Sequence, residues 1–177
     1  MRFGKFLFAA GLALVGTSAA AQDVTYDYDK GAAFSGFKTY AWVPGTNLKD
    51  ELNHKRVVDA IDAQLAAKGF AKVEASAHPD VFVAYHATFD KDLRITGFSS
   101  GWGGYRFGGS RSGTATTDTI LNGTLVVDIV DAKTGSIAWR GVASKEIDIK
   151  ANAEKRDKNI KKTAEKLFKN YPPQTRG

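Results

Sequence analysis

Residues 123–141 constrain the fold of this chain more than any other segment. Two apolar runs rich in β-branched residues flank a short Asp-Ala-Lys-Thr-Gly sequence at 131–135. β-Branched residues favour extended backbone, whereas Asp, Thr and Gly are favoured in the turns that reverse it. The segment therefore predicts a β-hairpin whose loop has about four to five residues.

The N-terminus has the pattern of a secretory signal peptide. Two positive charges precede an apolar stretch at residues 6–15, and three alanines at 19–21 fit the rule for cleavage after a small residue. An apolar stretch of this length is too short to cross about 30 Å of hydrocarbon, which disfavours a membrane-spanning segment. We therefore expect residues 1–21 to be removed, leaving a soluble, exported chain without a stable membrane anchor.

The composition indicates the cellular compartment of the mature chain and the partners it could bind. It contains no cysteine, which excludes disulfides, a thiolate nucleophile and the lipidated cysteine of bacterial lipoproteins. Exported domains without disulfides are more typical of a bacterial periplasm than of eukaryotic secretion. The net charge of +6 becomes +4 without Arg2 and Lys5, a mild excess that favours anionic envelope surfaces. It is far from the pattern of a nucleic-acid-binding protein, so we expect no nucleic acid partner.

The remaining segments predict an α+β fold: an antiparallel β-meander sheet with two amphipathic helices packed on it. Alternating apolar residues predict strands, helical spacing predicts the two helices, and two prolines end the second helix. From residue 22 onward we expect one domain. The predicted strands lie at 24–28, 37–43, 70–74, 81–89 (continuing at 93–98), 114–130 and 137–149, and the helices at 49–68 and 152–170.

Four blocks, in this order along the chain, resemble a known bacterial family. They are the F-K-T-Y-A-W sequence at 37–42, the P-D-V-F-V-A-Y sequence at 79–85, the hairpin from G-T-L-V-V-D to W-R-G, and the closing Y-P-P at 171–173. Together they are similar to the family catalogued as domain of unknown function 4136. The resemblance implies a bacterial envelope protein, commonly a lipoprotein, without an assigned activity. This chain departs from that pattern by lacking the lipidated cysteine.

Asp128 is the one charged residue on a strand face that Thr124, Val126 and Val130 otherwise form. Arg140 lies on the returning strand, close to Asp128 in either plausible hairpin register. We interpret the two as a cross-strand structural pair, of a kind worth about 0.2–1 kcal/mol. The alternative is a charge pair that contacts a ligand.

A glycine- and aromatic-rich loop spans about residues 97–113, where seven of seventeen residues are glycine. One hypothesis is that Trp102, Tyr105, Arg106 and Phe107 bind a glycan, a lipid headgroup or a partner through aromatic faces and charge. The alternative is a hairpin tip that needs no partner, because glycine does not support a packed core.

Basic residues recur between 155 and 169 on the second predicted helix. They could contact phosphates of the outer-membrane surface. The alternative is the solvated back of an amphipathic helix whose apolar stripe packs on the core.

Catalytic and metal-binding signatures are absent from the sequence. His54, His78 and His86 have no metal-ligand spacing, and no G-x-S-x-G motif occurs. We therefore predict a non-catalytic periplasmic or cell-envelope accessory protein without metal or cofactor, soluble or peripherally associated with the outer membrane. Its expected partner is an envelope protein or an anionic envelope component. The alternatives are a glycan- or lipid-headgroup-binding module that uses the glycine-rich loop, and an unrecognised hydrolase.

Overall fold

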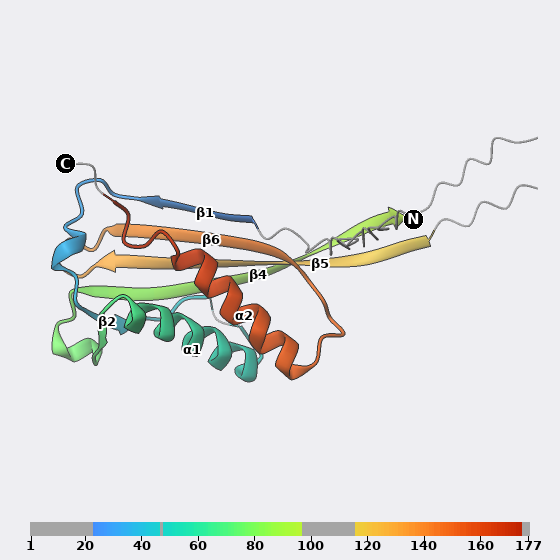
Figure 1. The fold of residues 1–177 in the computed structure, drawn as a ribbon, viewed down its shortest axis with the longest axis horizontal. Coiled ribbons are helices and arrows are strands. Elements are labelled where there is room, and N and C mark those ends of the chain that lie inside the picture. The colour runs from blue at the N-terminus through green and yellow to red at the C-terminus, as the bar shows by residue number, and fades with distance from the viewer. Residues whose placement is uncertain (1–22, 47, 97–115, 175–177) are drawn as a thin grey trace, which may run out of the picture.

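The computed structural model describes residues 23–46, 48–96 and 116–174 as a six-stranded sheet with both helices on one face (Figure 1). The strand order is β1-β6-β5-β4-β2-β3. The elements along the chain are β1 (Asp23–Tyr28), the 3-10 turn η1 (Phe34–Gly36), β2 (Thr39–Trp42), α1 (Glu51–Ala67), β3 (Ala71–Lys72), the 3-10 turn η2 (Ala75–Ala77), β4 (Val81–Thr96), β5 (Thr116–Asp131), β6 (Ile137–Ile147) and α2 (Ala153–Phe168).

The α+β class is confirmed, but the prediction of a purely antiparallel meander is wrong. Strands β4, β5, β6 and β1 are antiparallel neighbours, whereas β2 pairs in parallel with both β3 and β4. The reason is the position of α1 between β2 and β3. A helix that crosses over the sheet returns the chain to its starting edge, so the next strand runs in the same direction. The sheet is therefore mixed.

The predicted hairpin joins β5 to β6, and polar groups of its own residues close the turn. The Asp131 carboxylate accepts a hydrogen bond from the Lys133 backbone N–H at 2.8 Å. The Gly135 N–H donates to the Asp131 carbonyl at 2.9 Å, and Gly135 has a φ of +70°. That left-handed conformation favours glycine, which explains its place in the turn. Across the hairpin, Asp128 lies directly opposite Arg140.

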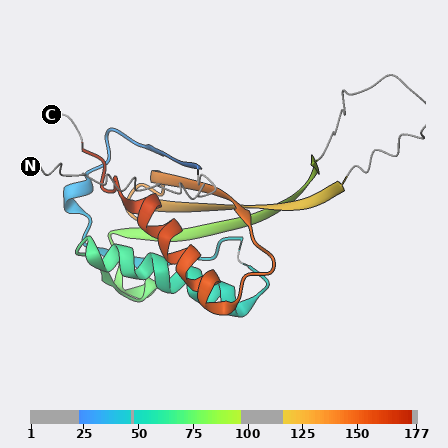
Figure 2. The ribbon, with the colours of Figure 1, turned by 45° about the vertical axis from the view of Figure 1, so that its right-hand side comes forward.

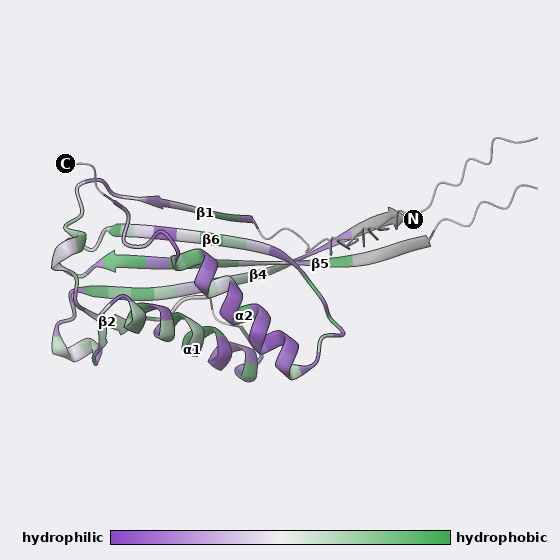
Figure 3. Cartoon of the chain, in the orientation of Figure 1, coloured by the Kyte–Doolittle hydropathy of each residue, from purple (hydrophilic) through white to green (hydrophobic). Residues whose placement is uncertain are grey.

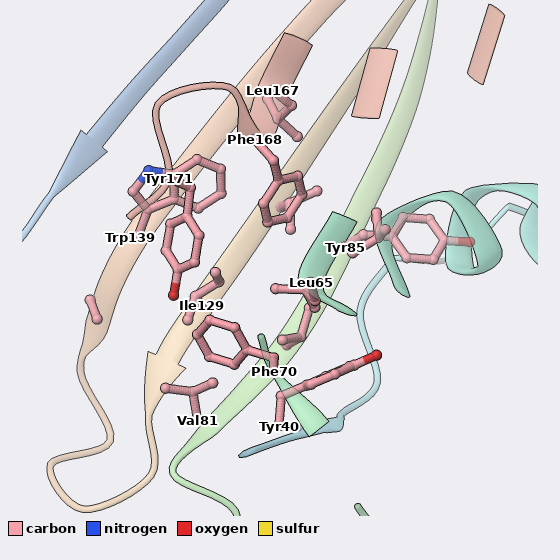
Figure 4. Close-up of a cluster of buried hydrophobic side chains, with 14 of the residues drawn as sticks. Tyr40, Leu65, Phe70, Val81, Tyr85, Ile129, Trp139, Leu167, Phe168 and Tyr171 are labelled. Carbon is pink, nitrogen blue, oxygen red and sulfur yellow. The ribbon is translucent and has the colours of Figure 1, made fainter. Parts of the chain in front are cut away.

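The hydrophobic core lies between the sheet and the two helices (Figure 4). Trp139 of β6 is fully buried, with its ring centroid 5.3 Å from that of Phe168 and 5.2 Å from that of Tyr171. These two residues, with Leu167 on α2, belong to the apolar stripe predicted for the second helix, and all three are buried. The outward side of α2 is hydrophilic, and the hydrophobic residues follow the strands beneath it (Figure 3).

The helices cover only part of the sheet. Strands β4 and β5 continue together beyond both helices as a two-stranded ribbon, paired as far as Thr96 and Thr116 (Figure 2). The expected extended segment at 93–98 is thus the continuation of β4 as far as Thr96. The ribbon leaves the helical layer at the end of the sheet where both helices begin.

Candidate functional site

An open groove with a cavity volume of about 330 Å³ lies between the two layers of the fold. Its floor comes from β4, β5 and β6, and its walls come from the N-terminal parts of α1 and α2 and from Asp148, Ile149 and Ala151, which follow β6. The lining residues place it where the N-terminal parts of both helices lie over the sheet. At this end of the sheet the β4–β5 ribbon extends beyond the helices (Figure 1).

Strand alternation explains why this floor is apolar. One cross-strand row consists of residues 87, 125 and 143, on β4, β5 and β6. The side chains of this row lie on the face of the sheet that the helices cover. The next row is Phe89, Gly123 and Lys145. A Cβ atom on Gly123 would lie 2.8 Å from Ile147 Cδ1 and 3.4 Å from Phe89 Cε1. The missing side chain therefore lets Phe89 and Ile147 approach each other above the backbone of β5.

Large apolar side chains at this groove remain open to solvent. The exposed fractions are 51% for Phe89, 36% for Ile147 and 63% for Ile149, and all three residues line the cavity. By contrast, Trp139 and Ile129 in the core beside it are fully buried. Apolar side chains that gather at an open concavity mark a surface suited to binding.

Lys145 and Arg156 bring two positive charges to the groove. Lys145 is half-buried, and its Nζ donates to Asn159 Oδ1 at 3.4 Å. Arg156 donates from Nη2 to the Ile149 carbonyl at 3.3 Å. Within the described part of the chain, neither cation forms an ion pair with a carboxylate.

Neighbouring lysines on α2 differ from these two cations. Lys155 Nζ lies 2.7 Å from Asp148 Oδ2, and Lys161 Nζ lies 2.8 Å from Asp157 Oδ2. Both are exposed, as are Lys158, Lys162, Lys166 and Lys169. Part of the basic run is thus neutralised by nearby acids. Arg156 is the member of that run that reaches the groove.

The predicted pair Asp128 and Arg140 lies on the opposite face of the sheet from the groove. Arg140 Nε and Nη2 donate to the two oxygens of Asp128 at 2.6 and 2.7 Å, and this carboxylate raises the pKa of Arg140. The Asp128 side chain is only 6% exposed, and His86 Nε2 lies 3.6 Å from its Oδ2. The His86 ring also accepts a hydrogen bond from the Thr46 backbone N–H at 3.1 Å. The structural role of this pair stays a prediction.

The first of the four sequence blocks has a structural explanation. Tyr40 OH and Trp42 Nε1 both donate to Asp62 Oδ1, at 2.7 and 2.8 Å, which fastens β2 to α1. Burial and this hydrogen bond raise the pKa of Tyr40, so the phenol keeps the proton that it donates. These residues hold the scaffold together and do not line the groove.

The three histidines are not brought together. His54 lies on α1, His78 follows η2 with a φ of +52°, and His86 lies on β4. Within the residues that the structure describes, no group of three His, Cys, Asp or Glu side chains could hold a metal ion. No helix in the same part of the chain is long and apolar enough to cross a membrane. The candidate binding residues Trp102, Tyr105, Arg106 and Phe107 lie outside the described residues.

The groove is less evident from the sequence than the hairpin is. Gly123 inside a strand indicates the close approach of another group, which is the role it has here. Ile147 is the last residue of β6, and Ile149 continues the alternation of apolar residues just after the strand ends. The positions of Lys145 and Arg156 were not predictable, because they depend on how β6 and α2 pack.

The fold and the groove together define a two-layer α+β domain with an open, mainly apolar groove between its layers. A family model described as "Domain of unknown function (DUF4136)" matches residues 24–173, and the chain belongs to this family. The family resemblance seen in the four sequence blocks is thereby confirmed. No curated protein matches the chain.

Solved structures share the fold at low sequence identity. A DUF4136 family protein from Bacteroides thetaiotaomicron has a TM-score of 0.52 at 16% identity, covering 85% of this chain and 96% of its own. A singly substituted PelC from Paraburkholderia phytofirmans, solved as a dodecamer, has a TM-score of 0.51 at 10% identity, covering 84% of this chain and 96% of its own. A PDZ domain protein from Parabacteroides distasonis has a TM-score of 0.58 at 18% identity; the match covers 89% of this chain and only 36% of that protein. These similarities concern the fold alone.

Proposed function

We propose that this chain is an exported, non-catalytic accessory protein of the bacterial envelope that binds the acyl chain of a lipid in the groove between its helices and sheet. The observation that carries the proposal is the cluster of Phe89, Ile147 and Ile149, exposed at the mouth of a cavity of about 330 Å³. The signal-peptide pattern of residues 1–21 supports export.

The dimensions of the groove favour a slender apolar ligand. Sites for small molecules have volumes of about 300–1,000 Å³ and mostly apolar walls with a few polar groups. This groove lies at the small end of that range. Each methylene moved out of water into such a site contributes about 0.8 kcal/mol, so a single acyl chain gives enough burial for binding.

The expected ligand also fits the chemistry of the described residues. No cluster of metal-ligating side chains occurs among them, and the groove is lined mainly by aliphatic and aromatic groups. Such walls retain an apolar chain by burial. The proposal therefore concerns transport, storage or sensing of a lipid.

The test is binding of the neutral dye N-phenyl-1-naphthylamine to the chain purified from periplasm, and its displacement by dodecanol. We expect saturable fluorescence that dodecanol reverses. Ala87→Phe fills the floor of the groove and is expected to weaken dye binding about ten-fold or more, because the lost apolar burial is not replaced. Thr88→Phe is the matched control, because its side chain lies on the opposite face of the same strand.

Thermal unfolding of both variants establishes that they are folded. Should Ala87→Phe fail to fold, Thr163→Phe fills the groove from the α2 wall and serves instead. Unchanged dye affinity in a folded groove variant, or no saturable binding by the unaltered chain, would contradict the proposal.

A further inference from the structure

We infer that the lipid bound in this groove is anionic, and that Lys145 and Arg156 hold its negatively charged head group. The inference rests on the proposed function and specifies the ligand class of the same site. The head group would be a carboxylate, as in a free fatty acid, or a phosphate, as in a phospholipid. Both are oxyanions that accept several hydrogen bonds from cationic donors.

The first step is the position of Lys145. It shares its cross-strand row with Gly123 and Phe89, so its aliphatic stem emerges from the apolar floor of the groove. The residue is half-buried, and its ammonium donates to the neutral amide oxygen of Asn159 at 3.4 Å. Placing a cation beside apolar walls with only a long neutral contact costs desolvation energy, which an anion would offset.

The second step is the position of Arg156 on the facing wall. Its Nη2 donates to the Ile149 carbonyl, which places the guanidinium at the groove end of α2. An arginine that gives one nitrogen to a backbone carbonyl keeps further N–H donors for a ligand. Lys145 and Arg156 come from different layers, so an oxyanion between them would contact both the sheet and α2.

The acidic residues near the groove do not neutralise these two cations. The Asp148 carboxylate is already held by Lys155 Nζ at 2.7 Å and by the Lys150 backbone N–H at 2.9 Å. Glu146, whose backbone lies opposite that of Asn122 on β5, also lines the groove, but strand alternation starts its side chain on the face of β6 opposite to that of Lys145. The positive charge at the groove is thus available for a ligand with an apolar tail and a negative head.

Four ligands with the same twelve-carbon chain test the inference by displacement of N-phenyl-1-naphthylamine. They are dodecanoate, dodecyl phosphate, dodecanol and dodecyltrimethylammonium. We expect dodecanoate or dodecyl phosphate to displace the dye at concentrations at least about ten-fold lower than dodecanol, because hydrogen bonds to a charged group are stronger than those to a neutral one. The stronger of the two anions identifies the source of the head group.

The double variant Lys145→Met/Arg156→Met keeps the apolar stems and removes the charges. It is expected to bind anion and alcohol within about two-fold of each other and to bind dodecanol as before. The matched control is Lys158→Met/Lys162→Met, which removes two exposed cations of the same helix and should retain the preference for the anion. Such a control separates a head-group contact from a general effect of net charge.

Equal displacement by dodecanoate, dodecyl phosphate and dodecanol would overturn the inference while leaving the proposed function intact. A preference for the anion that survives the double variant would also overturn it. Tighter binding of dodecyltrimethylammonium than of either anion would overturn the inference as well. Failure of all four ligands, dodecanol included, would instead overturn the proposed function.

Discussion

Asp128 is a carboxylate with almost no access to water, and its two oxygens are satisfied by one guanidinium. The bidentate contact with Arg140 at 2.6 and 2.7 Å is the geometry in which an arginine compensates best for lost hydration. On a solvated strand pair this contact would be worth about 0.2–1 kcal/mol. Because the Asp128 side chain is only 6% exposed, removal of its partner would leave a poorly hydrated charge.

Arg140→Met should therefore destabilise the fold by more than an exposed pair would. We expect a loss of about 1–3 kcal/mol in the free energy of unfolding, measured by urea denaturation at neutral pH. Lys158→Met, which removes an exposed cation from α2, should change stability by less than about 0.5 kcal/mol. Equal stability of Arg140→Met and the unaltered chain would show that Asp128 and Arg140 are not a structural pair.

At the scale of elements, Asp80 fastens the start of β4 to the start of β2. Its carboxylate accepts hydrogen bonds from the Lys38 and Thr39 backbone N–H groups and from Thr39 Oγ1, each at 2.9 Å. The Thr39 hydroxyl oxygen in turn accepts from the Asp80 N–H at 3.0 Å. The aspartate of the Pro-Asp sequence thus explains how two parallel strands begin in register, and its backbone donors lower the pKa of Asp80.

This lowered pKa predicts a pH dependence of stability. A carboxyl group whose folded-state pKa lies below its unfolded value stabilises the fold above the unfolded pKa of about 3.9, and this contribution is lost as pH falls through the folded pKa. Between pH 5 and pH 3 we expect the unaltered chain to lose more stability than Asp80→Asn. Urea denaturation at each pH measures the difference. Parallel curves for the two proteins would show that this carboxylate contributes nothing to the acid sensitivity.

The elements differ in how well their sequences predict them. The spacing of Leu167, Phe168 and Tyr171 predicts the buried stripe of α2, because that helix meets the core along one face. Strand β3 consists of Ala71 and Lys72 alone, so neither its length nor its period could show that it pairs in parallel with β2. Local patterns thus predict the elements, while the direction of pairing depends on the crossover through α1.

At the scale of the whole molecule, the local sequence patterns do not predict the groove. Phe89 lies far from Lys145 and Arg156 in the sequence, and only the antiparallel register and the placement of α2 bring the three residues to one cavity. Each has an ordinary local explanation: an aromatic residue in a strand, a lysine near a strand end and an arginine on a helix. Their shared surface exists only in the assembled fold.

The proposal of export makes a prediction for the whole chain. When the protein is expressed with its own N-terminus in a Gram-negative host, we expect it in the periplasmic fraction, beginning at Gln22. Intact-mass measurement of the purified protein would show the loss of residues 1–21. A protein of full mass that remains in the cytoplasm would contradict export, without bearing on what the groove binds.

The groove lies between the two layers of the fold rather than on the surface of one of them. A ligand there would touch both helices and the sheet, so its binding energy would add to the free energy that holds the layers together. At a concentration about one hundred times its dissociation constant, such a ligand stabilises the native state by about 2.7 kcal/mol. Resistance to heat would then report whether the groove is occupied, and any process that separates the layers would release the ligand.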